Sequence, residues 1–361
     1  MDNGTNPLKV AVIGAGYWGP NLARNFSAAL DWELVAICDK DTARAAALAR
    51  KVGFPAVVGS VDELLTGHDV DAVAIATPAR THHAIAMQAL AEGKHVLVEK
   101  PLADRGDAGR QMVALAQERG LVLMADHTYC YTPAAIKIRD LVFGGELGEI
   151  LYIDSVRINL GLVQPDVDVF WDLAPHDLSI LDFILPGGLR PLEVSAHGAD
   201  PLGAGKACVG YLTMPLAGGA IANIHVNWLS PTKIRKMVIG GSRKTLIWDD
   251  LNPQQRISVY DRGVNLDCQE LVRGDVTERT EAAISYRLGD TWSPSLEEFE
   301  PLGRMVAQFH ASITTKLPSP TDGSAALRVL AVLEAASRSL AEGGSNAAVD
   351  GSGIELQEVL R

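Results

Sequence analysis

The chain carries a glycine-rich turn close to its N-terminus, between an apolar run and a helical stretch. The run is VAVIGAGYWG, in which Gly14, Gly16 and Gly19 have the spacing G-x-G-x-x-G. After a strand and before a helix, such glycines allow a tight turn, the close approach of a pyrophosphate and close packing of the helix on the strand. The N–H groups and partial positive charge of a helix N-terminus favour phosphate at the same place. This pattern predicts a dinucleotide site that includes the neighbouring Tyr17 and Trp18.

A carboxylate at the end of the second apolar run supports this prediction. The run LVAICD ends at Asp39, twenty residues after Gly19. At this spacing a carboxylate accepts hydrogen bonds from the ribose hydroxyls of adenosine. Asp39 favours NAD because it repels a 2′-phosphate, whereas the adjacent Lys40 can attract one. NAD is therefore the expected cofactor, with NADP as the alternative, and Trp18 either shields the cofactor or packs in the fold.

The first 125 residues repeat one pattern, in which a short apolar run is followed by a helical stretch. The runs are VAVIG, WELVAICD, AVVG, VDAVAIATP, KHVLVEKP and LVLMAD. Strands that are apolar throughout and separated by helices indicate a parallel sheet with both faces covered. The predicted fold class is therefore α/β, with a doubly wound Rossmann domain over residues 1–127. We expect Ser60 or Asp62 to cap the helix in SVDELLTG.

After Tyr129 the pattern changes. Apolar and polar residues alternate in several successive runs that short polar turns separate, among them EILYIDSVRINLG and GAIANIHVNWLS. Such runs predict an α+β domain with a large, mostly antiparallel open sheet over residues 128–361. From Leu296 the chain is helical again, and these helices can pack back on either domain. The stretch 263–294 has little periodicity and is expected to be rich in loops.

Composition excludes several classes of function. The formal net charge of −12 over 361 residues repels phosphate backbones, so nucleic acid is not an expected partner. No run approaches the roughly 20 apolar residues that cross a bilayer, and the polar N-terminus does not resemble a signal peptide. We expect a cytoplasmic protein without a metal site, because its cysteines form no C-x-x-C pair. The cysteines are Cys38, Cys130, Cys208 and Cys268.

One apolar run ends unusually, on Glu99-Lys100-Pro101. In a doubly wound sheet the C-terminal ends of the strands line the crevice that holds the ligand. Lys100 is therefore expected at the edge of this crevice, near the nicotinamide, together with Thr77 and Pro78 from the end of another run. An amine at this position can assist proton transfer. The alternative is an ion pair, either with Glu99 or at the surface.

The segment DLAPHDLSIL places Asp172 four residues before His176. Two residues at this spacing share one face of a helix. Pro175 favours a helix start here, so Asp172 lies either in the first turn or at the cap. In both arrangements the pair sits at a helix N-terminus, whose potential should lower the pKa of His176 and favour neutral imidazole. The alternative is a packed histidine, and Asp177 is an alternative cap.

Together, the glycine fingerprint and the ATP, EKP and D-x-x-x-H segments resemble the Gfo/Idh/MocA family, the glucose–fructose oxidoreductase and inositol dehydrogenase group. The resemblance covers nearly the whole chain and implies hydride transfer between NAD(P) and a carbon of a sugar, cyclitol or nucleotide sugar. It also implies that Lys100 assists catalysis or positions substrate, and that His176 is the general acid/base with Asp172 assisting. The positions that it adds to the cofactor site are Thr77, Pro78, His82 and Glu99.

Further residues are candidates for contact with the substrate. His127 and Tyr129 follow the last run of the first domain and can enter the crevice, with core or hinge roles as the alternative. Arg157 and Asn159 share one face of a predicted strand by its period of two. They can reach substrate hydroxyls or line a solvated face. His82 and the adjacent His83 point apart and so do not predict a metal site.

A basic group stands out in this acidic chain. It either receives a phosphate from a nucleotide sugar or forms a solvated charged face. Its members are Lys233, Arg235, Lys236, Arg243 and Lys244.

The predicted function is that of an NAD(P)-dependent sugar dehydrogenase or ketoreductase acting on CH–OH. The segments GYWGPNLARNF and DLAPHDLSIL resemble those of sugar-modification enzymes. This resemblance makes an activated sugar the expected substrate. Two alternatives stay open: a glycosidase that recycles its bound NAD, and a non-catalytic NAD(P)-binding protein, against which the presence of both Lys100 and His176 argues. An uncovered apolar sheet face is costly in water, and relatives commonly associate through it, so a homodimer or homotetramer is expected.

Overall fold

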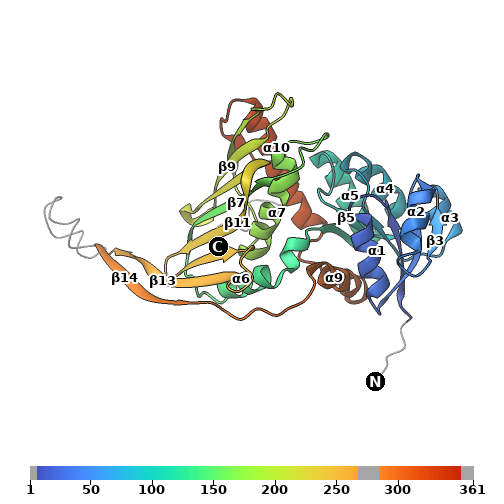
Figure 1. Ribbon diagram of the computed structural model, residues 1–361, viewed down its shortest axis with the longest axis horizontal. Coiled ribbons are helices and arrows are strands. Elements are labelled where there is room, and N and C mark those ends of the chain that lie inside the picture. The colour runs from blue at the N-terminus through green and yellow to red at the C-terminus, as the bar shows by residue number, and fades with distance from the viewer. Residues whose placement is uncertain (1–5, 267–283, 351–361) are drawn as a thin grey trace, which may run out of the picture.

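The N-terminal part of the chain forms a six-stranded parallel sheet in the order β3-β2-β1-β4-β5-β6 (Figure 1). The computed structural model describes residues 6–266 and 284–350. The apolar runs become the strands because helices bury both faces of this sheet. The expectation of a doubly wound sheet is confirmed. The strands are β1 (Leu8–Ile13), β2 (Trp32–Cys38), β3 (Ala56–Val58), β4 (Ala72–Ile75), β5 (His95–Glu99) and β6 (Leu123–Asp126).

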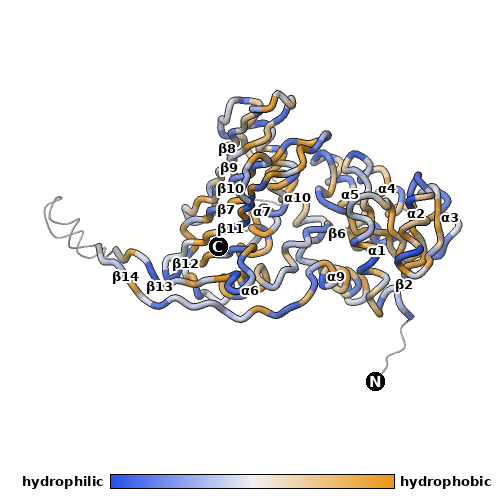
Figure 2. Tube along the Cα trace, viewed as in Figure 1, coloured by the Kyte–Doolittle hydropathy of each residue, from blue (hydrophilic) through white to orange (hydrophobic). Residues whose placement is uncertain are grey.

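Two apolar cores lie on the two faces of this sheet. One face packs against α3, α4 and α5, and the other packs against α1 and α2. Ser60, one of the two expected caps, accepts a hydrogen bond from the N–H of Glu63 at the start of α3. In Figure 2 hydrophobic residues gather along the strands of this part of the chain. The helices are α1 (Gly19–Ala28), α2 (Thr42–Ala49), α3 (Val61–Gly67), α4 (His82–Ala91) and α5 (Gly106–Arg119).

The second part of the chain forms a nine-stranded sheet in the order β14-β13-β12-β11-β7-β10-β9-β8-β15. Every neighbouring pair is antiparallel except β7 and β10, so the predicted mostly antiparallel sheet is confirmed as a mixed one. The strands are β7 (Ile150–Leu160), β8 (Glu193–Ala199), β9 (Val209–Pro215), β10 (Ile221–Asn227), β11 (Leu229–Gly241), β12 (Thr245–Asp249), β13 (Ile257–Leu266), β14 (Ile284–Trp292) and β15 (Ala347–Ala348).

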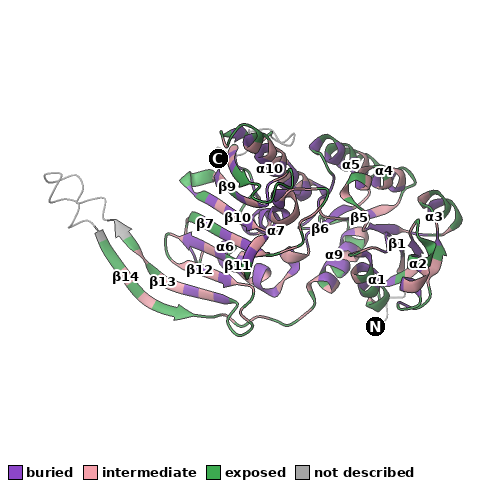
Figure 3. Cartoon of the chain, turned by 45° about the horizontal axis from the view of Figure 1, so that its top comes forward, coloured by how far each residue is buried: buried purple, intermediate pink, exposed green. Residues whose placement is uncertain are grey.

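Helices cover one face of the second sheet. α6 (Pro133–Phe143), α7 (Val169–Ile184) and α10 (Gly323–Ala341) pack on this face and share one apolar core with the strands. The opposite face carries Tyr152 and Tyr211, both exposed, and no described helix packs over it (Figures 1 and 3). α7 therefore lies between the second sheet and the N-terminal part of the molecule, and it faces the ends of the parallel strands (Figure 1).

The two C-terminal helices tie the two parts together. α9 (Pro301–Thr315) packs on α1, and its Phe309 stacks on Trp32 at 5.4 Å between ring centroids. α10 contacts both α5 and α7. No helix within the described residues has the length and apolarity that a bilayer crossing requires.

The expectation of loops over 263–294 is wrong for residues 263–266, which end β13, and for residues 284–292, which form β14 and pair with β13. The period of two was hard to recognise because both faces of this pair are open to water, as the adjacent exposed residues Ser285 and Tyr286 show. The pair extends away from the rest of the second sheet (Figures 1 and 3). Cys268 lies outside the described residues.

Candidate functional site

The glycine turn after β1 has the geometry of a phosphate cradle. Gly14 has φ +102°, and a Cβ there would lie 2.7 Å from the carbonyl oxygen of Ala76. A Cβ on Gly19 would collide with the carbonyl oxygen of Gly14, whereas Gly16 faces open space. Two glycines are therefore required by chain packing, and the third leaves room above the turn for a ligand. The shape and the N–H groups of this turn fit the pyrophosphate of a dinucleotide.

Asp39 lies beside this turn, at the end of β2. Its Oδ2 accepts a hydrogen bond from the N–H of Ala15 at 2.7 Å, and its Oδ1 accepts one from the N–H of Asp41 at 2.8 Å. These bonds fix the carboxylate next to the cradle, and each oxygen keeps a second lone pair. The arrangement fits the ribose hydroxyls of NAD, and Lys40 beside it is exposed.

Trp18 crosses from the glycine turn to the end of β6. Its Nε1 donates to the carboxylate of Asp126, which also accepts a hydrogen bond from Thr128. Asp126 is buried, and burial raises the pKa of this carboxyl against the effect of the two hydrogen bonds. Trp18 is thus anchored by its indole N–H, whereas Tyr17 is exposed. Sequence reasoning missed Asp126, although it ends an apolar run as Asp39 does.

His82 joins the turns that follow β4 and β5. The ring is fully buried, with Nδ1 2.9 Å from the carbonyl oxygen of Pro101 and Nε2 2.7 Å from that of Thr77. Neither ring nitrogen is free for a ribose hydroxyl, which differs from the expectation for this residue. His82 instead holds the backbone on both sides of the crevice edge, and Pro78 belongs to the same turn as Thr77.

Lys100 reaches from the end of β5 to α7. Its Nζ donates to the carbonyl oxygen of Asp172 at 2.9 Å and lies 3.3 Å from Oδ1 of the same residue. Oδ2 of Asp172 accepts a hydrogen bond from Trp228 Nε1 at 2.9 Å. The ion pair expected as the alternative does form, but its partner is Asp172 of the second part of the chain. The half-buried Glu99 lies on the same strand end, and burial raises its pKa to about 8.

α7 begins earlier than expected. Asp168 caps it by accepting the N–H of Trp171 at 3.0 Å, so Asp172 is in the first turn and neither Asp172 nor Asp177 is the cap. Pro175 lies inside the helix and lacks only the N–H that would bond to the carbonyl of Trp171. The prediction that Pro175 marks the helix start is therefore wrong, because a full turn of helix precedes it.

His176 lies one turn after Asp172, away from the helix N-terminus. Its ring is tilted on that of Tyr129 at 4.9 Å between centroids, and its buried Nδ1 has no partner within the described residues. The pKa of His176 is lowered well below 6.5, first by burial and then by the positive charges of Lys100 and Arg157. The expected direction is correct, but burial replaces the helix N-terminus as the cause.

His127 follows β6 at the same crevice. Both of its ring nitrogens are buried and without a partner among the described residues, and burial, assisted by the charge of Lys100, lowers its pKa to about 4. Buried polar atoms normally have partners. The unpaired nitrogens of His127 and His176 are therefore positions where water or a bound substrate can supply the missing hydrogen-bond partner.

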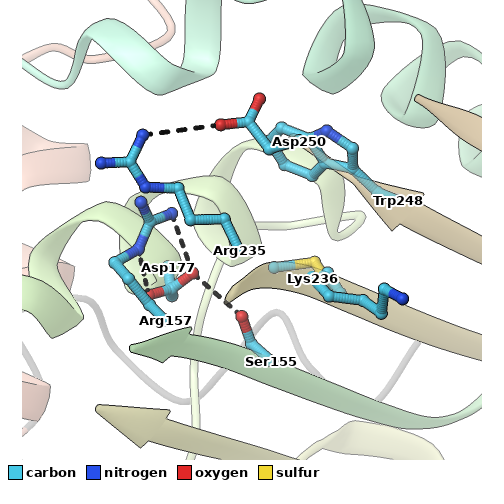
Figure 4. Close-up of a pocket in the computed structure, with 8 residues that line it drawn as sticks. Ser155, Arg157, Asp177, Arg235, Lys236, Trp248 and Asp250 are labelled. Carbon is cyan, nitrogen blue, oxygen red and sulfur yellow. Dashed lines mark hydrogen bonds and ion pairs between the residues drawn. The ribbon is translucent and has the colours of Figure 1, made fainter. Parts of the chain in front are cut away.

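Arg157 does not point freely into the crevice. It is buried on β7 and forms a bidentate ion pair with Asp177, with Nε 2.8 Å from Oδ2 and Nη2 3.1 Å from Oδ1 (Figure 4). Ser155 Oγ donates to the same carboxylate at 2.9 Å. The guanidinium group of Arg157 stacks on Tyr129, 4.5 Å from the ring centroid. Arg157 thus supports Tyr129, and Asn159 lies two residues further along, partly buried.

The basic group is not one patch. Lys236 pairs with Asp249 at 3.1 Å, Lys244 pairs with Glu146 at 2.7 Å, and Arg235 lies 3.7 Å from Asp250. Each of these three cations has a different carboxylate neighbour, and Arg235 and Lys236, as successive residues of a strand, face opposite sides of the sheet. No group of His, Cys, Asp and Glu side chains that could hold a metal ion occurs in the part of the chain that the structure describes.

Comparison with known proteins matches both parts of the chain. Residues 8–127 match the family described as the oxidoreductase family with an NAD-binding Rossmann fold, and residues 135–247 match the GFO/IDH/MocA C-terminal domain. Over 330 residues the chain is 31% identical to UDP-N-acetylglucosamine 3-dehydrogenase of Acidithiobacillus ferrooxidans, covering 90% of this chain and 94% of that protein. It is also 32% identical over 216 residues to D-glucoside 3-dehydrogenase of Escherichia coli, covering 56% and 61%.

Solved structures agree with this result. The crystal structure of the A. ferrooxidans enzyme superposes with a TM-score of 0.78 at 27% identity, covering 94% of this chain and 99% of that one. GenD2 from gentamicin A biosynthesis, solved in complex with NAD, gives a TM-score of 0.77 at 26% identity, covering 94% and 95%. The predictions of an NAD-binding Rossmann domain and of an oxidoreductase are confirmed.

Proposed function

The chain belongs to the Gfo/Idh/MocA family of NAD-binding oxidoreductases, and from this premise we propose that it oxidises a secondary alcohol of a sugar, cyclitol or nucleotide sugar, or reduces the corresponding ketone. The main observation that supports this proposal is the contact between Lys100 and α7. The amine of Lys100, from the parallel sheet, is bound to Asp172, and His176 lies one turn further along the same helix. Two domains thus contribute to one cluster at the crevice.

Each residue of this cluster has a role in moving the substrate proton. His176 is neutral at neutral pH because its pKa is low, so its imidazole can accept the proton of the substrate hydroxyl. The ammonium group of Lys100 has three N–H donors, and its contacts with Asp172 leave donor capacity for the substrate oxygen. Asp172, held by Trp228, fixes the direction of Lys100.

Bound NAD supplies the hydride acceptor, and the protein supplies orientation and proton transfer. The turn of Gly14, Gly16 and Gly19 would hold the phosphates of NAD, and Asp39 would hold its adenosine ribose. The other cofactor contacts that we propose are with Tyr17, Trp18, Lys40, Thr77, Pro78, Glu99 and Lys100. The unpaired nitrogens of His127, together with Tyr129, would meet the substrate. Arg157 and Asn159 are the remaining residues that we propose for the substrate site. Arg157 acts there by holding Tyr129 in place.

An activated sugar is the substrate that we favour within this class. The full-length relative from A. ferrooxidans is named for a UDP-linked sugar, and other relatives are named for glucosides and inositol. A phosphate on the substrate needs a positively charged partner, and Arg235 lies 5.7 Å from the ring centroid of Tyr129 at the candidate site.

A glycosidase that recycles its NAD remains the competing proposal. It would use the same cluster to oxidise and then reduce one sugar, so NADH would not accumulate. The test is absorbance at the NADH band, with purified protein and either NAD or NADP, against a panel of free, glycosidic and nucleotide-linked sugars. The proposed dehydrogenase gives a steady increase with at least one substrate. Sugar release without such an increase would support the glycosidase instead.

We further propose a homodimer or homotetramer formed through the uncovered sheet face, and a domain boundary between residues 127 and 128. Tyr211 stacks on His225 on this face at 4.4 Å between ring centroids, and both Tyr152 and Ile221 are exposed on it. Burying such a face removes apolar surface from water.

A reducing cytoplasm fits the three described cysteines, Cys38, Cys130 and Cys208, which are free and buried.

A further inference from the structure

Arg235, on β11, makes fewer hydrogen bonds than Arg157, the other arginine that lines the same pocket. Its side chain is 31% exposed, its only carboxylate neighbour in the described residues is Asp250 at 3.7 Å, and that separation is too long for a hydrogen bond. Arg157, by contrast, makes two hydrogen bonds to Asp177. A guanidinium group has five N–H donors. Arg235 therefore presents donors that have no acceptor in the described structure.

The guanidinium group of Arg235 faces the candidate site. Its central carbon lies 5.7 Å from the ring centroid of Tyr129, and the same ring lies 4.9 Å from that of His176. The charge of Arg235 is also among the causes that lower the pKa of His176. One aromatic ring thus separates Arg235 from the proposed base, a distance that a sugar ring with an attached group can span.

A second unsatisfied donor lines the same pocket. Trp248 on β12 is 3% exposed, and its Nε1 has no partner among the described residues. Figure 4 shows Arg235, Asp250 and Trp248 around the pocket, next to the Arg157–Asp177 pair. Both oxygens of Asp177 are already occupied by Arg157, and one of them also by Ser155. The pocket is partly open to solvent and holds about 10 Å³, roughly the room that one water-sized group needs.

We propose that Arg235 and the indole N–H of Trp248 form a subsite for an oxyanion carried by the substrate, either a phosphate or a carboxylate attached to the sugar that is oxidised. One oxygen of this group enters the small cavity and accepts the N–H of Trp248. The other oxygens face Arg235, whose fork of donors matches an oxyanion better than the long contact with Asp250 does. This inference rests on the proposed function and narrows its substrate class.

The neighbouring residue on β11 provides a matched control. Lys236 carries the same charge and also lines the pocket, but its amine lies away from the guanidinium group of Arg235 (Figure 4). It pairs with Asp249 at 3.1 Å. The variants to compare are Arg235→Gln, Arg235→Lys and Lys236→Gln. The substrates are one sugar in three forms: the neutral methyl glycoside, the nucleoside diphosphate derivative and the corresponding uronate.

We expect Arg235→Gln to lower kcat/KM about tenfold or more for a charged form, mainly through a higher KM, because bidentate hydrogen bonds are lost. The neutral glycoside should change less than twofold, and Arg235→Lys should restore part of the loss. Lys236→Gln should leave all three forms within twofold. A loss confined to the diphosphate assigns a phosphate to the subsite, and a loss confined to the uronate assigns a carboxylate. Equal losses for charged and neutral forms, or no loss for either charged form, would overturn the proposal.

A binding measurement separates this inference from the proposed function. The probes are pyrophosphate, UDP and glucuronate, titrated calorimetrically into the NAD-loaded wild type and Arg235→Gln. At least one probe should bind the wild type, and Arg235→Gln should bind it about tenfold more weakly, even if no sugar in the panel is oxidised. Equal binding of all three probes to both proteins, or binding of none to the wild type, would refute the subsite while leaving the dehydrogenase proposal intact.

Discussion

Lys100 illustrates how a single residue connects the two domains at the candidate site. It ends an apolar strand, yet its amine is bound by Asp172 on a helix that the chain reaches only 72 residues later. The position of Lys100 could be predicted because strand ends of a doubly wound sheet line the crevice. Its partner could not, because pairing of Lys100 with Asp172 depends on how two domains pack, and no local pattern carries that information.

The neutral state of His176 gives a first prediction. We expect the imidazole to titrate well below pH 6.5 in the wild type, so kcat/KM should fall with acidification only below that pH. Lys100→Met removes the largest charge effect on the ring, and the pKa of His176 should rise while remaining lowered by burial. NMR titration of the histidine resonances, assigned with His176→Asn, measures both values. An identical pKa in wild type and Lys100→Met would contradict the proximity of the two groups.

Glu99 gives a prediction about stability. Between pH 4.5 and about 8 the carboxyl is protonated in the folded chain and ionised in the unfolded one, so the folded state binds more protons. The free energy of unfolding therefore falls as pH rises through this window. Glu99→Gln stays neutral and should unfold at a higher urea concentration than the wild type at pH 8, by about 1–2 kcal/mol because the side chain is only half-buried.

The control for Glu99→Gln is the same pair of proteins at pH 4.5, where both side chains are largely uncharged in the native state. Their urea midpoints should nearly coincide there. A difference that does not change between pH 4.5 and pH 8 would show that Gln alters packing and would reject a raised pKa for Glu99.

At the scale of elements, the turns after β4 and β5 are held in place by one side chain from α4. His82 touches the carbonyl oxygens of Thr77 and Pro101, and its neighbour His83 instead bonds to Gln111 at the surface. The sequence predicts that the two adjacent histidines point apart, but not which of them is buried. Which of the two is buried depends on the rotation of α4 against the sheet.

A matched pair of substitutions tests this arrangement. His82→Leu leaves two carbonyl groups at a buried position without their ring partner, and we expect it to lower the free energy of unfolding by about 2–4 kcal/mol. His83→Leu should change it by less than about 0.5 kcal/mol, as surface substitutions usually do. Urea unfolding of both variants measures the difference. Equal effects would mean that His82 does not hold the two turns together.

Two elements differ from the expectation for physical reasons. Pro175 suggested a helix start, but a proline costs an internal helix only one hydrogen bond and some steric strain, and burial of α7 against the sheet outweighs that cost. β14 was hidden because an arm exposed on both faces needs no apolar alternation. The strands of the parallel sheet, in contrast, were predictable because burial on both faces requires them to be apolar.

At the scale of the whole molecule, α9 and α10 return from the second domain to the parallel sheet. α9 adds Phe309 to the core beside Trp32, and α10 bridges α5 and α7. A boundary predicted from the sequence at residue 127 therefore separates the two sheets, but helices from beyond it pack on both. This packing fixes the orientation of α7, and with it His176, relative to Lys100.

The uncovered sheet face gives a prediction about assembly. The wild type should sediment at micromolar concentration as a dimer or tetramer, and Tyr211→Lys should shift it toward the monomer, because a charge in a buried apolar interface is costly. Leu317→Lys is the control, since Leu317 is also exposed but follows α9, away from this face. A monomeric wild type, or dissociation by the control variant alone, would refute assembly through the sheet.

The most direct measurement for the site is a double-mutant cycle on kcat/KM with Lys100→Met and His176→Asn, using the substrate that the panel identifies. We expect each single variant to lose about 10²–10⁴-fold in turnover while still binding NAD, because the glycine turn and Asp39 are unchanged. The double variant should lose little more than the worse single one, because residues that act as a unit have non-additive effects. Losses that multiply, or either single variant with full activity, would show that this amine and this imidazole do not act together.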